Sequence, residues 1–170
     1  MFEAGDTVIY GSQGVCKITG TEQKRIGGKY VNYLVLHPVY DENSTIFVPA
    51  DNESLIGKMK PVLSEEEVYD MINSISEEEI IEAGDDNERR EQYQKIITEG
   101  DRYMLFRLIK TLYLKRISQE KKGKKLHQSD EAILKQAEKL LHNEFALVLD
   151  IKPDEVFPLI MNSIEKKKIS

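Results

Sequence analysis

The 170-residue chain contains no tryptophan, one cysteine and three histidines. A single cysteine, Cys16, excludes an internal disulfide, and within a strand it is most simply a small buried apolar residue. The alternative, a catalytic thiol, needs a histidine base, and nothing in the sequence places His37, His127 or His142 near it. The chain therefore offers few candidates for a nucleophile or a metal ligand.

The sequence also has no apolar stretch that approaches the roughly 20 residues of a membrane span. Residues 1–6 lack the basic start and apolar run of a secretion signal. We therefore expect a cytoplasmic protein with no membrane partner. No phosphate-binding loop or metal-ligand cluster is evident either, so we expect no cofactor, no metal and no small-molecule substrate.

The formal net charge of −6 is unevenly distributed along the chain. Residues 61–100 hold thirteen acidic and three basic side chains, whereas residues 101–170 hold ten acidic and fifteen basic ones. Such asymmetry indicates oriented association with a charged partner. The glutamate runs at 65–67 and 77–79, taken alone, are more simply explained as a solvated helix face.

The N-terminal third of the chain has the pattern of short strands. In "GDTVIYGSQGVCKITG", residues 5–20, two alternating runs flank a glycine-bounded turn, which predicts two strands joined by a tight loop. The second of these strands is expected to run from Val15 to Glu22, and further strands are expected at 29–37 and 45–48, with a possible short fifth. So many short strands within residues 1–60 predict a small twisted β-barrel.

Helical signals begin after Pro61. Ser64 with Glu67, and Ser76 with Glu79, have the spacing of a capping box, in which each side chain satisfies a backbone amide of the first helical turn. The remaining helices are expected at 87–98 with a stop at Gly100, at 101–118, from Ser129 as the cap onward, and at 153–165 with a kink at Pro158. The sequence thus predicts an α+β protein, with a barrel domain at 1–60 and an all-α helical domain at 61–170.

Several of these segments resemble one known family. "FEAGDTVIYGSQGVCKI", followed by "YLVL" and "VPAD", resembles the Tudor-like RNA-polymerase-interacting barrel of the bacterial CarD/CdnL transcription regulators. "RRE" at 89–91, "EGD" at 99–101 and "LHQSDEAILKQAEKLLHNEFAL" at 126–147 resemble that family's paired arginines, its Gly-Asp helix break and its last helix. The resemblance covers residues 2–149.

The resemblance implies a non-enzymatic transcription regulator. Its barrel is expected to dock on the lobe of the RNA polymerase β subunit by adding a strand to the β-subunit sheet. Its helical domain is expected to contact promoter DNA at the upstream edge of the transcription bubble and to modulate open-complex stability. The implied partners are therefore RNA polymerase and promoter DNA.

The resemblance places polymerase contacts at Lys24, Arg25, Thr45 and Phe47. Lys24 keeps the basic character of the contact, whereas Phe47 stands where some relatives have a basic residue. Because Phe47 lies in an apolar alternating run, the sequence is compatible with either a core aromatic or an exposed contact there.

The DNA-contacting part departs from the family, because many members place a wedge tryptophan before the paired arginines. This chain has no tryptophan; Ile80 or Ile81 could replace it, and Asp85, Asp86 and Glu88 precede the arginines and would repel phosphate. Weak binding to DNA alone is therefore expected. The candidate phosphate contacts are Arg89, Arg90, Lys121, Lys122, Lys124, Lys125 and Lys135, although the lysine-rich segment could equally be a solvated helix connection.

Two other classes of function remain open from the residues. The protein could dock on polymerase and use its acidic segment, residues 61–100, to bind another protein with no DNA contact. An enzyme is the second alternative, but neighbouring carboxylates such as Asp85 and Asp86 point to different sides of a helix and cannot converge on one substrate. We therefore expect no catalytic activity.

Overall fold

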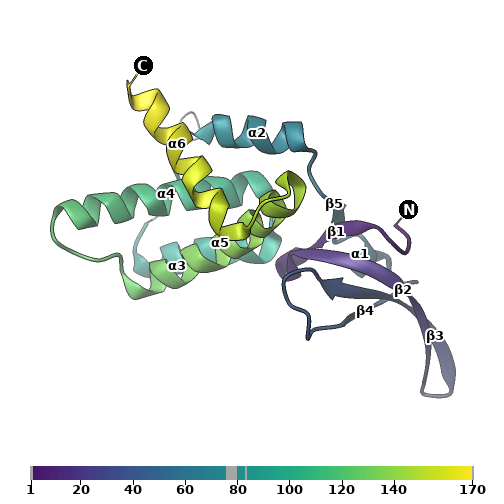
Figure 1. Cartoon of the computed structure of the whole chain (residues 1–170). Coiled ribbons are helices and arrows are strands. Elements are labelled where there is room, and N and C mark those ends of the chain that lie inside the picture. The colour runs from purple at the N-terminus through teal and green to yellow at the C-terminus, as the bar shows by residue number, and fades with distance from the viewer. Residues whose placement is uncertain (1, 76–79, 83, 170) are drawn as a thin grey trace. The chain divides into compact units, whose positions relative to one another are not determined.

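The computed structural model describes residues 2–75, 80–82 and 84–169, with the side chains of 165–169 left aside. The chain divides into two compact units, Met1–Val62 and Leu63–Ser170 (Figure 1). None of the described helices is long and apolar enough to cross a membrane. Each unit is described by itself below.

The N-terminal unit is built around a five-stranded antiparallel sheet in the order β4-β3-β2-β1-β5. Its elements are β1 (Thr7–Tyr10), a 3-10 turn η1 (Gly11–Gln13), β2 (Val15–Ile26), β3 (Lys29–Pro38), β4 (Ile46–Pro49), the short helix α1 (Glu53–Ile56) and β5 (Met59–Pro61). The predicted strand positions agree with these, but β2 continues four residues further than expected, to Ile26.

The extension of β2 creates a long hairpin with β3 (Figure 1). Its turn is made by Gly27 and Gly28, whose φ angles of 58° and 82° lie in the region that glycine adopts without strain. Ile26 pairs with Lys29 on either side of this two-residue turn, which fixes the register of the whole hairpin.

A closed barrel is not confirmed. In the described part of the chain β4 and β5 are the two end strands of the sheet and do not pair with each other. β5 has only three residues and ends at Pro61, which has no backbone N–H to extend a ladder. The fold class is therefore α+β, with an open antiparallel sheet followed by helices.

The core of the N-terminal unit is apolar. Its buried residues are Val8, Cys16, Ile18, Leu36, Val48 and Met59. Along β1, β2, β3 and β4 these positions alternate with more exposed ones, as expected for a sheet with one covered face. The prediction that Cys16 is a buried apolar residue is confirmed, since its side chain is 0% exposed.

The C-terminal unit is helical. Its elements are α2 (Glu65–Asn73), α3 (Asp86–Glu99), α4 (Arg102–Lys121), α5 (Gln128–Leu149), a 3-10 turn η3 (Pro153–Glu155) and α6 (Val156–Ile169). α4 and α5 lie side by side, joined by the turn that follows Lys121 (Figure 1).

Local signals set most of these helix ends. The capping box of Ser64 and Glu67 is confirmed, with both hydrogen bonds at 3.1 Å, and α3 ends at Gly100 in the left-handed conformation. The second predicted box, Ser76 with Glu79, lies outside the described residues.

Two predicted helix ends are corrected. α5 is capped by His127, whose Nδ1 accepts from the Ser129 amide, so Ser129 already lies inside the helix. Pro158 falls in the first turn of α6 rather than in the middle of a helix that begins at Pro153. A first-turn proline removes no helical hydrogen bond, so the expected cause of a kink is absent there.

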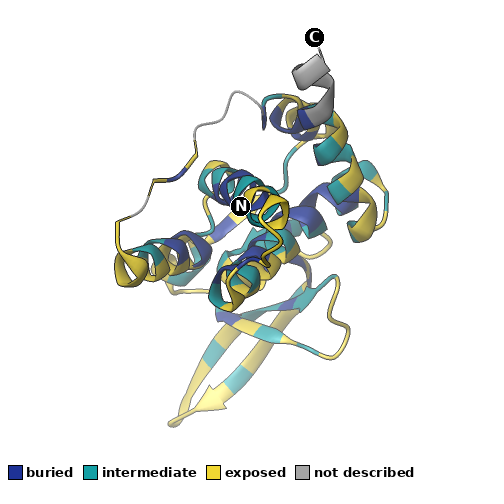
Figure 2. Cartoon of the chain, turned by 90° about the vertical axis from the view of Figure 1, so that its left-hand side faces the viewer, coloured by how far each residue is buried: buried dark blue, intermediate teal, exposed yellow. Residues whose placement is uncertain are grey.

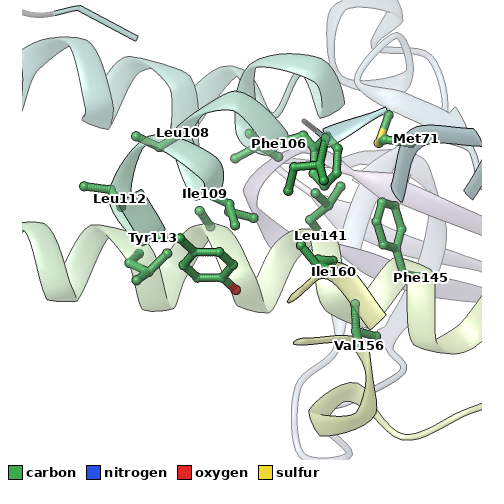
Figure 3. Packing of buried hydrophobic residues seen from close by; sticks show 14 of the residues in the cluster. Met71, Phe106, Leu108, Ile109, Leu112, Tyr113, Leu141, Phe145, Val156 and Ile160 are labelled. Carbon is green, nitrogen blue, oxygen red and sulfur yellow. The ribbon is translucent and has the colours of Figure 1, made fainter. Parts of the chain in front are cut away.

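One hydrophobic core joins the helices of this unit. Figure 3 shows Phe106 of α4 close to Leu141 and Phe145 of α5, and Ile109 and Leu112 of α4 belong to the same buried cluster. The rings of Phe106 and Phe145 meet edge to face with centroids 6.3 Å apart. The opposite helix faces are largely exposed, as the yellow ribbon segments in Figure 2 show.

Candidate functional site

Three side chains from three neighbouring strands meet on the face of the sheet that is turned away from its core. Lys24 lies on β2, Tyr33 on β3 and Phe47 on β4. The Lys24 ammonium is 3.5 Å from the centroid of the Phe47 ring and 5.9 Å from that of Tyr33. The two rings meet edge to face at 6.2 Å. These three side chains form a cation–π cluster. A cation–π contact at an exposed site contributes a favourable interaction free energy of roughly 0.5–1 kcal/mol.

Strand alternation places Phe47 outside the core. Val48, its neighbour in β4, is 1% exposed and belongs to the core, and Ile46 packs against the core. Phe47 is 37% exposed and pairs in register with Val35 of β3. Of the two possibilities left by the sequence, the structure therefore shows an exposed aromatic.

The other two expected polymerase contacts do not join this cluster. Arg25 lies on the opposite face of the hairpin, where its guanidinium carbon is 5.8 Å from the centroid of the Tyr30 ring. Tyr30 is 66% exposed. Thr45 is exposed and immediately precedes β4.

The edge of β4 adjoins the cation–π cluster. Within the described residues β4 pairs with β3 on one side and with no strand on the other. An edge strand presents unpaired backbone groups, which can pair with a strand from another chain. The sheet therefore offers an open backbone edge on β4, the strand that also carries Phe47 of the cluster.

In the helical unit, the paired arginines have different surroundings. Arg89 donates from Nε to Oδ1 of Asp130 at 3.2 Å and from Nη1 to Oδ1 of Asp86 at 2.6 Å. Lys115 donates to Oδ2 of Asp130 at 2.7 Å. Asp130 is 1% exposed, so it forms a buried ionic junction that joins the starts of α3 and α5 to α4.

Arg90, in contrast, is exposed. The junction at Asp130 brings the start of α3, which carries Arg90, toward the start of α5, and α5 follows directly on the lysine-rich segment. Lys121, Lys122, Lys124 and Lys125 are all exposed. The acids Asp85, Asp86 and Glu88 lie at the start of α3, so anionic groups lie close to Arg90 in the chain.

Lys135 lies apart from these lysines. It lines a surface hollow of about 280 Å³ with Glu138, Lys139, His142 and residues near Pro153. His142 is buried there, and burial lowers its pKa to about 4. Burial also raises the pKa of the neighbouring Glu138 carboxyl. The predicted DNA contacts therefore do not form one continuous group.

Of the two isoleucines considered as replacements for a wedge tryptophan, only Ile80 is accessible. Ile80 is 52% exposed, whereas Ile81 is buried in the helical core and its amide donates to Oγ1 of Thr111 at 2.9 Å.

The acids near the start of α3 have structural roles. Asp85 caps α3 by accepting from the Glu88 amide at 2.9 Å, and the hydrogen bond from Arg89 lowers the pKa of Asp86. Over the part of the chain that the structure describes, no group of three His, Cys, Asp or Glu residues is arranged to hold a metal ion. Burial raises the pKa of the Cys16 thiol to about 11.

Sequence reasoning missed the Asp130 junction and Tyr33. Asp130 looks like an ordinary first-turn acid of α5, and no local pattern links it to Arg89, 41 residues earlier. Tyr33 could have been found, because it shares one face of a predicted strand with Val31 and Val35.

Two family patterns match the chain and together span most of it. The CarD-like/TRCF RID domain matches residues 2–62, and the CarD C-terminal domain matches residues 67–161. No curated protein matches the sequence. A sheet domain of this kind followed by this helical domain defines an RNA-polymerase-interacting transcription factor. The chain belongs to the CarD family, whose members are non-enzymatic factors.

Proposed function

We propose that this protein regulates transcription by docking its N-terminal sheet on the lobe of the RNA polymerase β subunit. Once docked, its helical unit contacts upstream promoter DNA and changes the lifetime of the open complex. The observation that carries the proposal is the contact of Lys24 on β2 with Phe47 on β4, next to the open edge of β4, within the domain matched as CarD-like.

The chemistry of this surface suits a docking site. Strand addition at β4 would supply backbone hydrogen bonds and a fixed orientation, whereas Lys24 and Phe47 would supply specificity through charge and an aromatic ring. The cation–π contact holds the Lys24 ammonium over Phe47 before any partner arrives, which reduces the conformational entropy lost on binding.

For the DNA contact, we propose Arg90 and the exposed lysines 121, 122, 124 and 125 as the phosphate-binding groups. Arg89 is better suited to hold the helices together, because two of its nitrogens already donate to carboxylates. The acids at the start of α3 oppose phosphate, so binding to free DNA is expected to be weak. Docking on polymerase would raise the local concentration of the helical unit at the promoter and make a weak contact effective.

Binding of the full-length chain to purified polymerase tests the docking surface. Lys24→Glu and Phe47→Ala should each weaken the complex, by about 1–3 kcal/mol for the charge reversal. Lys60→Glu on β5 is the matched control, because Lys60 is exposed on the strand at the other end of the sheet. Equal affinity for all three variants would disprove the assigned surface.

The alternative, a polymerase-docking protein with no DNA contact, is favoured by the engagement of Arg89 and by the acids around Arg90. The salt dependence of promoter-complex formation separates the two. Each phosphate contact contributes about 0.9 to the slope of log K against log salt. If adding this protein to polymerase leaves that slope unchanged, the alternative is correct.

A further inference from the structure

The helical unit has a surface groove that the proposed function does not use. It lies between α2 and the first turn of α4 and has a volume of about 290 Å³. Its lining residues are Leu63, Glu67, Asp70, Met71, Ser74 and Tyr103. Small-molecule sites usually range from about 300 to 1,000 Å³, so this groove suits one or two protein side chains better than a cofactor.

The groove has an apolar floor and an exposed aromatic wall. Met71 is 6% exposed and belongs to the helical core, and Leu63 packs against that core. Tyr103 rises from the first turn of α4 and is 64% exposed. An exposed tyrosine beside buried apolar groups is typical of the residues that dominate binding energy in protein interfaces.

Both walls of the groove are tied to the same buried carboxylate. Glu144 of α5 is 2% exposed and accepts from the Leu63 amide at 2.9 Å. It also accepts from Nε of Arg102, the neighbour of Tyr103, at 2.8 Å. These bonds fix the segment that leads into α2 and the first turn of α4, so a ligand would meet a preformed groove and lose little entropy on binding.

The rim of the groove is acidic. Glu67 and Asp70 line it, and Glu65 and Glu66 lie on the same short helix. Hydrogen bonds with Ser64 lower the pKa of Glu67, which favours its ionised form. A negative rim around an apolar floor repels nucleic acid and anionic lipid and attracts cationic groups.

We propose that this groove binds a helical segment of a protein partner in which an apolar side chain is flanked by lysine or arginine. The apolar side chain occupies the space between Met71 and Tyr103, and its cationic neighbours pair with Asp70 and Glu67. This partner site shares no residue with the proposed polymerase-docking and DNA-contacting surfaces, and its test is independent of theirs.

Titration of the 15N-labelled full-length chain with a defined peptide tests the proposal. The probe is a helical peptide of leucine and lysine with its leucines on one face. One control peptide has the same composition with leucines spread around the helix, and a second replaces every lysine with glutamate. Changes in the chemical shifts of backbone amides should be confined to the region of Leu63–Ser74 and Tyr103. They should appear with the probe peptide and not with either control peptide.

Substitutions localise the binding further. Asp70→Lys and Tyr103→Ala should each lower the affinity for the probe peptide by about tenfold or more, whereas Tyr103→Phe should retain most of that affinity. Glu99→Lys is the matched charge control, because Glu99 is an exposed acid of α3 outside the groove. Equal losses for Asp70→Lys and Glu99→Lys, or shifts elsewhere, would show only general charge attraction and overturn the proposal.

Sedimentation of the full-length chain tests the other occupant, a second copy of this protein. A monomer over a wide concentration range supports an external partner. Self-association that Tyr103→Ala abolishes would assign the groove to a second copy and overturn the proposal. Polymerase binding by the Tyr103→Ala variant should be unchanged, so failure of the groove proposal is distinguishable from failure of the docking proposal.

Discussion

The two units of this protein differ in the interactions that stabilise each of them internally. The N-terminal sheet packs an apolar core, and its charged groups, such as Lys24, lie on the outer face. The helical unit also has an apolar core, but it buries the carboxylates of Asp130 and Glu144 and pairs each with cations. Charge is thus a surface feature in one unit and an internal feature in the other.

Backbone hydrogen bonding accounts for this difference. Strands are fixed to their neighbours by backbone hydrogen bonds, so the pairing of β2, β3 and β4 leaves their outward side chains available for recognition. A helix satisfies its backbone internally, so only side chains determine how it meets the next helix. Asp130 and Glu144 supply directional contacts where apolar packing alone would be less specific.

Asp130→Ala is expected to have the largest effect. It would leave Arg89 and Lys115 without the buried carboxylate that both now contact, and breaking such a pair typically costs about 3–5 kcal/mol. Urea unfolding followed by helical circular dichroism would measure the loss. Glu99→Ala, which removes an exposed pair with Lys95 at 3.8 Å, is the control and should cost less than about 1 kcal/mol. Equal losses would refute the structural role of the junction.

Acid should destabilise the helical unit through His142. Burial lowers its pKa in the folded state to about 4, from 6.5 when unfolded, so the unfolded chain binds the proton more tightly. The contribution of His142 to the free energy of unfolding is therefore present above pH 6.5 and is lost as the pH falls toward 4, by up to about 3 kcal/mol.

Comparison with His142→Leu isolates this contribution. The raised pKa of Glu138 acts in the opposite direction, because folding favours its protonated form, so the wild-type pH dependence alone is ambiguous. Urea midpoints between pH 4 and 7 should fall less steeply with acid for the variant than for the wild type. Parallel curves would contradict the assignment.

Cys16 should report on the apolar core of the sheet. Its pKa is raised from 9.0 to about 11, so its thiolate fraction at pH 8 should be about 100-fold lower than that of an unhindered thiol. Reaction with a disulfide reagent should be slow in the native protein and fast in urea. Fast native labelling would show that the sheet core opens readily.

The smallest expected effect separates the two arginines. Arg90→Ala should reduce the salt slope of promoter-complex formation by about 0.9 per lost phosphate contact and leave the urea midpoint unchanged. Arg89→Ala should instead lower the midpoint, because it breaks the pair with Asp130. If Arg90→Ala leaves both the salt slope and the open-complex lifetime unchanged, Arg90 is not a DNA contact.

Much of the fold could be predicted because its signals are local. The capping box of Ser64 and Glu67 and the stop at Gly100 depend on neighbouring residues, and the structure confirms both. Barrel closure could not be predicted in this way, because it depends on whether β4 and β5 meet. The exposed position of Phe47 likewise needed the registers of the strand pairs, since its apolar neighbours suit either face.

The arginine pair shows most clearly what the sequence determined by itself and what required the tertiary structure. The sequence alone places Arg89 and Arg90 near the start of a helix, after the acids Asp85, Asp86 and Glu88. Successive residues of a helix point about 100° apart, so only one of the two could face a neighbouring helix. The packing of α3 against α5 turned Arg89 toward the buried Asp130 and left Arg90 in solvent, because a buried carboxylate needs a cationic partner.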